Sequence, residues 1–349
     1  MENNNLNDLF SQLLTPSIDG KPNMNTLNMA LRDLLAIKHN IKNFGYQLAS
    51  EISTSSSNYE VGDEPKIINL KSKPTTQEDM ESSWVKYWSK QLKIEPIMHR
   101  KIWELCYVPQ ALYENLGIIE GMKGIVFGAG EEPLPALFAS LGADITVTDL
   151  HPDKVKDMGW VESNQHTNSL EKVYYENIID KETFDKKVSL EYVDMNDIPR
   201  ELDGKYDFCW SVCALEHLGS IQNGLDFIEN SLNVLKPGGL AVHTTEYNYT
   251  NEFYTIDNWP TVFFQDKHFI ELAEKLRKKG FNVADISFDI GNKPLDRYID
   301  IPPYSEGEGW ITKESWGNVN QHAHLKLSVD GFPCTSFGMI ISKPISEVN

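Results

Sequence analysis

Cysteine, positive charge and long apolar runs are all scarce in this sequence. Its 349 residues include four cysteines, Cys106, Cys209, Cys213 and Cys334. Because none is spaced as a CxxC pair, a zinc site built on them is disfavoured. No segment reaches the roughly 20 apolar residues that a membrane-spanning helix needs, and the polar start of the chain lacks the pattern of a secretory signal. These absences predict a cytoplasmic protein with reduced cysteines and no membrane partner.

Acidic residues exceed basic ones, 51 against 32, which leaves a formal net charge of −19. An acidic chain repels the phosphate backbone, so we expect no nucleic-acid partner. The densest basic group, residues 275–279, is typical of the solvated end of a helix. Hydrophobic residues make up 40% of the chain, which is ordinary for a globular protein with a full core.

The N-terminal third is predicted to be helical. Residues 1–51 carry helical periodicity, residues 52–76 are predicted to form a linker or surface loop, and residues 77–120 form a helical cap region rich in aromatic residues. Helices at the N-terminus could pair two copies of the chain as a homo-oligomer. The apolar residues of this helical stripe are Leu27, Leu31, Leu34, Leu35, Ile37 and Ile41.

After Gly121, short β-branched runs alternate with amphipathic segments. Strands that alternate with helices pair in parallel, with right-handed crossovers that place helices on both faces of the sheet. Residues 121–349 are therefore predicted to form a Rossmann-like, doubly wound α/β domain. Strands are expected at 124–128, 144–149, 188–194, 206–213, 240–246, 282–289 and 336–342, and helices at 134–141, 221–235 and 267–279.

A glycine-rich turn follows the first of these strands. Gly128 and Gly130 can adopt positive φ and let the backbone approach a ligand closely, and the next helix presents unpaired N–H groups. A dinucleotide-binding turn would have a third glycine where this chain has Pro133. Glu131 and Glu132 would repel a pyrophosphate, so S-adenosylmethionine (SAM), a nucleoside without phosphates, fits better. Taken alone, the two glycines are also typical of an ordinary tight turn.

Two acidic residues stand at the ends of the next strands. Asp149 ends the second strand about twenty residues after the turn, where a carboxylate can accept from both ribose hydroxyls of NAD or SAM. Asp194 ends the third strand and could accept the adenine amino group, with an ordinary acidic loop residue as the alternative. Cofactor contacts are expected from Gly128, Ala129, Gly130, Asp149, Leu150, Asp194, Met195 and Ser211.

In this order, the pieces resemble the class I SAM-dependent methyltransferases over residues 121–349. The resemblance implies a seven-stranded sheet whose last strand is antiparallel and lies beside the sixth. Its Glu-His-Leu at 216–218 is similar to that of members that methylate small molecules, including quinones and sugars. Phe127 departs from the acidic residue that many members carry there, which bears on the methionine contacts rather than on the fold. The matching segments are Gly128–Gly130, Asp149, Asp194–Met195, Asp207–Leu218 and Leu235–Gly239.

More narrowly, the chain is similar to bacterial methyltransferases of undefined substrate that carry a helical N-terminal extension. That similarity implies a role in pathways of polysaccharides and other surface sugars. The shared segments are Trp103-Glu104, Phe127–Pro133, Glu216–Ser220, His243–Glu246 and His324–Leu327.

Methyl transfer to a hydroxyl needs alignment of the acceptor and a base that removes its proton. Ligands of open α/β sheets bind at the carboxyl ends of the strands, so we expect the base there. His217 is the first candidate, with a histidine packed under a loop as the alternative. His243 and Glu246 are further candidates on or after the fifth strand, where alternation places them on opposite faces.

The long segment between the sixth and seventh strands, residues 291–333, holds a second set of candidates. His322 and His324 would share one face of a strand and could bind a divalent metal with Glu246, although a pair of polar loop histidines is the commoner outcome. The aromatic residues of this insertion suit an acceptor-binding wall or lid, and equally a hydrophobic seal.

The predicted function is transfer of a methyl group from SAM to a small-molecule or sugar-related acceptor, at an oxygen and with help from a base. Two alternatives remain. One is a SAM-binding scaffold module without turnover. The other, less favoured because the third glycine is missing, is an NAD-dependent oxidoreductase.

Overall fold

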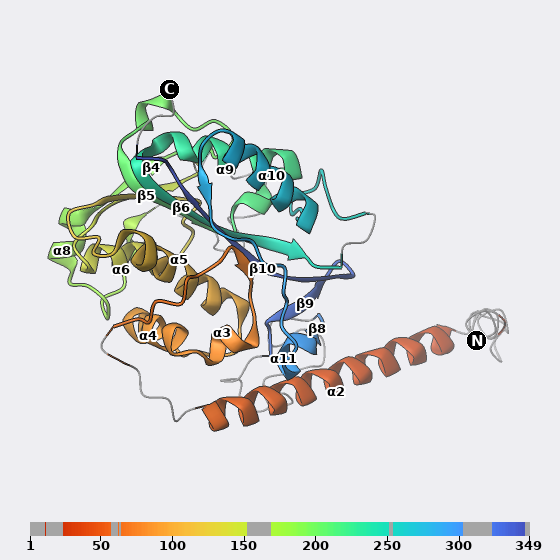
Figure 1. Cartoon of the computed structure of the whole chain (residues 1–349). Helices are drawn as coiled ribbons and strands as arrows, with labels where there is room; N and C mark the ends of the chain where they lie inside the picture. The colour runs from red at the N-terminus through yellow and green to blue at the C-terminus, as the bar shows by residue number, and fades with distance from the viewer. Residues whose placement is uncertain are drawn as a thin grey trace.

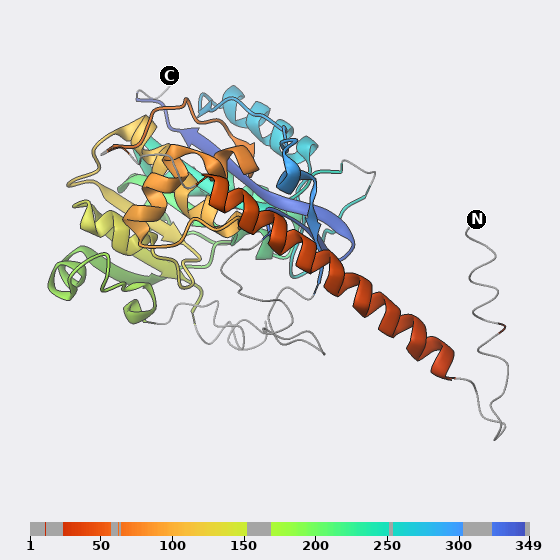
Figure 2. The same ribbon diagram turned by 90° about the horizontal axis from the view of Figure 1, so that it is seen from below.

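The computed structural model describes most of the chain. A body of helices and sheet carries one long helix that projects from it (Figure 1, Figure 2). The residues described are 11, 24–56, 62, 64–151, 169–250, 254–302 and 323–345.

The strands of these residues form one sheet. They are β1 (Lys73–Pro74), β2 (Lys123–Phe127), β3 (Asp144–Asp149), β4 (Val188–Tyr192), β5 (Tyr206–Val212), β6 (Leu235–Asn248), β7 (Asn282–Val283), β8 (Ile299–Asp300), β9 (Lys326–Val329) and β10 (Phe332–Ser342). The order is β4-β3-β2-β5-β6-β10-β9-β8, with β1 and β7 also paired to β10. Strands β2 to β6 pair in parallel, whereas β10 runs antiparallel to β6 and β7.

The predicted doubly wound α/β fold is confirmed, including an antiparallel last strand that lies between β6 and β7. The predicted count of seven strands is too low, because the sheet has ten. The three additions are β1, β8 and β9, which are two to four residues long. Elements this short carry too little periodicity to be detected in a sequence.

Three strand boundaries differ from the prediction by four residues or more, and one of them is the start of β10 at Phe332 instead of residue 336. β6 begins at Leu235 because residues 236–239 continue the strand through an irregularity in its pairing with β5, where Gly238 has a φ of 81°. β7 ends at Val283 instead of residue 289. The predicted helices appear as α6 (Leu134–Ser140), α9 (Ile221–Ser231) and α10 (Asp266–Lys278).

Helices cover both faces of the sheet, because alternate residues of a strand point to opposite sides (Figure 1). The other helices are α2 (Met24–Ser56), α3 (Gln77–Glu81), α4 (Ser83–Leu92), α5 (Arg100–Leu116), α8 (Lys181–Lys187), α11 (Pro294–Arg297) and the short 3-10 helices η1 (Leu170–Val173), η2 (Arg200–Leu202), η3 (Leu215–His217) and η4 (Leu232–Val234). Val126 of β2 joins the core under α4, α5 and α6, whereas Ile125 and Phe127 join the core under α9 and α10. Within the described ranges, no helix combines the length and apolar composition needed to cross a membrane.

Segment 52–76, predicted as a linker or surface loop, is partly built into the fold. Helix α2 continues to Ser56, and β1 adds Lys73 and Pro74 to the sheet. Buried Ser72 donates its backbone N–H to the Asp285 carbonyl at 2.9 Å. The proline suggested a loop, but a proline is tolerated in an edge strand such as β1.

The described flanks of the insertion pack against the N-terminal helices. Helix α11 lies against α2 and α3, and Tyr298 donates its hydroxyl to the Ile41 carbonyl of α2 at 3.2 Å. Gly45 makes room for this ring, since a Cβ there would overlap Tyr298. Trp310 and Trp316, on which the predicted lid depends, lie outside the described residues.

A buried ion pair fastens α2 to the body, and its loss should destabilise the fold. Lys42 Nζ lies 2.7 Å from Asp300 Oδ1, and the two side chains are 1% and 9% exposed. The Lys42→Met variant leaves a buried carboxylate without its cation, a change that costs about 3 kcal/mol. We expect a lower urea midpoint by tryptophan fluorescence for Lys42→Met. The exposed control Lys90→Met should stay within about 0.5 kcal/mol of the parent, and equal midpoints for both variants would contradict the assignment.

Candidate functional site

The turn after β2 is built so that only glycine fits its first position. Gly128 and Gly130 have positive φ values of 65° and 54°. A Cβ at Gly128 would lie 2.7 Å from Ala214 Cβ and 3.3 Å from Met195 Sδ. The segments that follow β4 and β5 therefore meet at this turn, in the crevice where open α/β sheets bind ligands.

Asp149 is held against the turn by two backbone hydrogen bonds. Its Oδ2 accepts from Gly130 N–H at 3.2 Å, and its Oδ1 accepts from Leu150 N–H at 2.8 Å. Ala129 N–H donates to the Thr148 carbonyl at 3.1 Å, which ties the turn to β3. A carboxylate offers about four lone-pair sites, enough to hold the two backbone groups and bind a pair of ribose hydroxyls.

Asp194 and Met195 lie at the same edge of the sheet, after β4. The Asp194 carboxylate accepts from Asn196 N–H at 3.0 Å and is partly exposed. Met195 is the neighbour of Gly128 described above. The structure thus brings together the predicted residues Gly128, Asp149 and Met195 from the tips of three adjacent strands.

Ser211 and His243, predicted as a cofactor contact and a base, lie in the core instead. Ser211 Oγ is 2.8 Å from His243 Nδ1, and Ser231 Oγ is 3.0 Å from His243 Nε2. Because the Ser231 hydroxyl donates to the Ile228 carbonyl at 2.7 Å, Nε2 must carry the proton. The alternation of β6 turns His243 toward α9 and away from the crevice. The predictions of Ser211 as a cofactor contact and His243 as a base are therefore wrong, because neither side chain faces the crevice.

His217 remains a candidate for the base. It ends η3 directly after β5 and is partly exposed. Its Nδ1 lies 3.0 Å from the Pro260 carbonyl and 3.2 Å from Thr261 Oγ1. A carbonyl can only accept, so Nδ1 carries the proton and Nε2 is the basic nitrogen.

A buried ionic cluster, formed by Arg100, Glu104, Cys213, Glu216 and Glu246, lies at the carboxyl ends of β5 and β6. Arg100 begins α5 and donates to Glu246 and, at 3.3 Å, to Glu104. Burial would lower the pKa of Arg100, but the charges of Glu246 and Glu104 raise it above its usual value. The sequence marked Glu104 only as part of a shared segment and did not mark Arg100, because their i,i+4 spacing is typical of an ordinary surface pair.

Glu246 and Arg100 are the members of the ionic cluster that carry an unmet hydrogen-bonding group in the described residues, Glu246 at Oε2 and Arg100 at Nε. Glu246 Oε1 accepts from Arg100, whereas its Oε2 is buried without a hydrogen-bond partner in the described part of the chain. Burial raises the pKa of this carboxyl, and Arg100 offsets part of the rise. Buried acceptors without partners are rare. Glu246 Oε2 is therefore suited to accept a hydrogen bond from a bound ligand.

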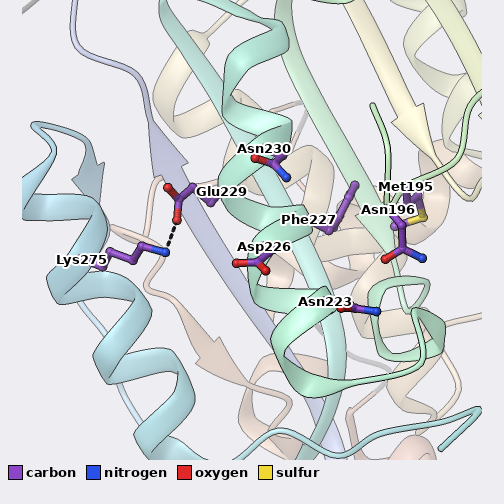
Figure 3. A pocket seen from close by; sticks show the side chains of 8 residues that line it. All are labelled: Met195, Asn196, Asn223, Asp226, Phe227, Glu229, Asn230 and Lys275. Atoms are coloured by element: carbon purple, nitrogen blue, oxygen red, sulfur yellow. Dashed lines mark ion pairs between the residues drawn. The ribbon is translucent and has the colours of Figure 1, made fainter. Parts of the chain in front are cut away.

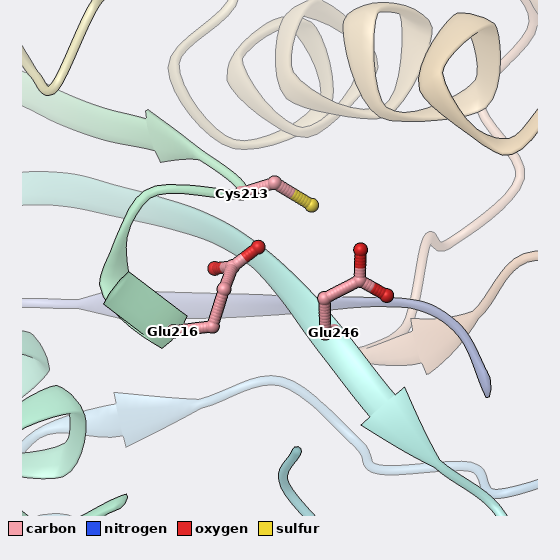
Figure 4. A group of neighbouring side chains, drawn as sticks. All are labelled: Cys213, Glu216 and Glu246. Carbon is pink, nitrogen blue, oxygen red and sulfur yellow. The ribbon is translucent and has the colours of Figure 1, made fainter. Parts of the chain in front are cut away.

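Cys213, Glu216 and Glu246 are spaced like metal ligands, since one ligand atom from each lies within 4.8 Å of the others (Figure 4). Two observations favour another role. Arg100 already places a cation there, with Nη1 3.7 Å from Cys213 Sγ. Burial also raises the pKa of the Cys213 thiol well above its usual value, whereas a metal needs the thiolate.

The predicted metal set of Glu246, His322 and His324 is not assembled by the residues that the structure describes. His322 lies outside them. His324 Nδ1 is 2.7 Å from Asp300 Oδ2, and its ring packs against His99 with centroids 4.6 Å apart. His324 therefore serves the packing of the insertion rather than the crevice.

The two carboxylates that follow the glycine turn both have partners. Glu132 accepts from Trp210 Nε1 at 2.6 Å, and burial raises the pKa of its carboxyl to about 8. Glu131 pairs with Lys172 at 3.1 Å. These contacts weaken the expected repulsion of a pyrophosphate, so that Pro133 becomes the main argument against NAD.

A polar groove lies between α9 and α10 (Figure 3). Lys275 of α10 pairs with Glu229 of α9 at 2.5 Å, so the densest basic run of the sequence faces an acidic partner. The groove adjoins the crevice through Met195. Its lining residues are Met195, Asn196, Asn223, Asp226, Phe227, Glu229, Asn230 and Lys275.

No protein-family model matches the chain, and no curated protein matches it. A SAM-dependent methyltransferase from Mesorhizobium loti shares 13% identity over 67% of this chain and 96% of its own, with a TM-score of 0.37. One from Aquifex aeolicus shares 16% over 67% and 88%, with a TM-score of 0.34. The [4+2]-cyclase SpnF shares 16% over 86% and 94%, with a TM-score of 0.39. Similarity this low does not bear on function.

The burial of neutral His243 predicts a loss of stability in acid. Burial lowers its pKa to about 3 in the folded protein, against about 6.5 in the unfolded chain. The unfolded state therefore binds the extra proton, and the contribution is complete above about pH 6.5 and lost progressively as the pH falls toward 3. We expect urea unfolding to show a steeper acid loss for the parent than for His243→Gln. Parallel pH profiles would contradict the buried, neutral assignment.

Proposed function

We propose that this chain is a class I SAM-dependent methyltransferase. The observation that supports the proposal is the meeting of three strand tips at one turn: Gly128 after β2, Asp149 at the end of β3 and Met195 after β4. The antiparallel β10, which lies between β6 and β7, has the position that the sequence resemblance implies for the last strand.

The residues at this turn fit the proposed cofactor. Gly128 and Gly130 leave the backbone bare of side chains where the methionine part would lie. The fixed carboxylate of Asp149 would hold the ribose hydroxyls, and Asp194 with Met195 would face the adenine. When bound, SAM supplies a methyl group made reactive by the sulfonium.

The acceptor is expected to bind beside the ionic cluster, at the ends of β5 and β6. A hydroxyl that donated to Glu246 Oε2 would satisfy the buried oxygen that lacks a partner. Burial raises the pKa of that carboxyl, which suits it to take a proton during attack. His217, whose basic nitrogen is Nε2, is the second candidate for this role. We therefore propose O-methylation of a small-molecule or sugar-related acceptor.

The ribose assignment is tested by SAM binding to Asp149→Ala. Loss of charge-assisted bonds to two hydroxyls, about 1.5–3 kcal/mol each, should weaken binding at least tenfold in calorimetry. Asp144→Ala is the matched control, because Asp144 begins the same strand and pairs with Lys187 at 2.9 Å, far from the turn. Equal SAM affinity in both variants would remove the ribose assignment, and binding of NAD in place of SAM would favour the oxidoreductase alternative.

The base is tested by turnover of labelled SAM with a panel of hydroxylated acceptors. Loss of a general base should lower the rate by about 10²-fold or more while SAM binding is retained. We expect this loss in Glu246→Gln or in His217→Ala. The variant that loses activity identifies the base. Retained rates in both would exclude base assistance by either residue, and SAM binding without turnover on any acceptor would favour the scaffold alternative.

A further inference from the structure

Helix α2 carries an apolar stripe on its outer face. The α2 stripe consists of Leu34, Ile37, Ile41, Phe44 and Leu48. These residues are separated alternately by three and four positions, which is the spacing of positions a and d in a coiled-coil heptad. In the sequence, the pattern extends back to Leu27 and Ala30 and so spans about three heptads, the length at which it becomes indicative of a coiled coil.

Most of the α2 stripe faces away from the body, whereas Leu48 at its C-terminal end packs against the core. Leu34, Ile37 and Phe44 are 49%, 54% and 70% exposed. The body instead contacts a different face of the helix, where Lys42 and Ala49 are buried. Single exposed apolar side chains are common on protein surfaces. A contiguous line of them is typical of an interaction site.

The shape of the molecule leaves room for a second helix along the α2 stripe. The N-terminal half of α2 extends beyond the sheet and its covering helices in both views (Figure 1, Figure 2). With 33 residues, the helix is roughly 50 Å long. A partner helix could therefore lie beside the N-terminal half of α2 without contacting the sheet or its covering helices.

Charged residues beside the stripe indicate what the partner is. With Leu34 and Ile41 at position a, Asp33 falls at g and Lys38 at the following e. In a parallel, in-register pair, position g of one helix faces position e of the next heptad of the other. Asp33 would thus face Lys38 of a second copy, and the symmetry would make the pair twice. A parallel copy of the same helix satisfies both the apolar and the charged pattern.

We propose that α2 pairs with α2 of a second copy of this chain in a parallel, in-register coiled coil. The proposal rests on α2 alone and stands apart from the proposed methyl transfer. It names the surface through which the chain forms a homodimer.

The mass in solution is the first test. Light scattering after gel filtration should give twice 39.8 kDa for the full chain. Ile37→Glu and Phe44→Glu place charges in the seam and should return the mass to that of one chain. Ala36→Glu is the control, because Ala36 is exposed at position c, off the seam. A parent chain that is monomeric, even if it binds lipid vesicles or another protein through the stripe, would overturn the proposal.

Orientation is tested by charge exchange and by cross-linking. Asp33→Lys or Lys38→Asp should weaken the dimer, and the double exchange should restore it, since the pair forms between copies. Under oxidation, Ile37→Cys should give a disulfide dimer and Ala36→Cys should not, against a background of four native cysteines that are all buried. A double exchange that fails to restore the dimer, or equal cross-linking at both positions, would exclude the parallel register.

Discussion

The candidate site depends on the close approach of helix α5 to strand β10. Gly338 of β10 has no side chain, and a Cβ there would overlap the ring of Tyr107. Tyr107 is further held by donating its hydroxyl to the Lys71 carbonyl at 2.8 Å. Arg100, Glu104 and Tyr107 are four and three residues apart, so they share one face of α5. The contact that seats Tyr107 therefore also directs Arg100 and Glu104 toward the carboxyl ends of the central strands.

This approach explains how several charges can be buried together at the crevice. Glu104 is fully buried and accepts from Arg100, from Ser336 of β10 and, at 2.8 Å, from Thr244 of β6. Burial would raise its pKa, but Lys101 and Arg100 hold it below the usual value. Buried charges are tolerated where such partners surround them. Against this background, Glu246 Oε2 is a buried acceptor and Arg100 Nε a buried donor without partners in the described residues, and a ligand is the simplest physical reason for these two unmet groups.

Features that depend on a few neighbouring residues could be predicted from the sequence. Features that depend on packing between distant segments could not. Strand periodicity, the glycine turn and Asp149 are each readable within a few residues, and the doubly wound fold follows from their order. Nothing local shows that Arg100 is buried, because that depends on β10, more than two hundred residues later in the chain. His243 was ambiguous for a related reason: alternation shows that neighbours face opposite sides, but only the packing of α9 shows which side is the core.

Asp300 and His324, on the two described flanks of the insertion, connect the proposed dimer helix with the crevice. Asp300 binds Lys42 of α2 with one oxygen and His324 with the other. His324 in turn accepts the backbone N–H of Arg100 at 3.0 Å through its carbonyl. These contacts form a continuous path from α2 to the first turn of α5, where Arg100 holds Glu246. The N-terminal helix is therefore joined by buried polar groups to the segment that positions the ionic cluster.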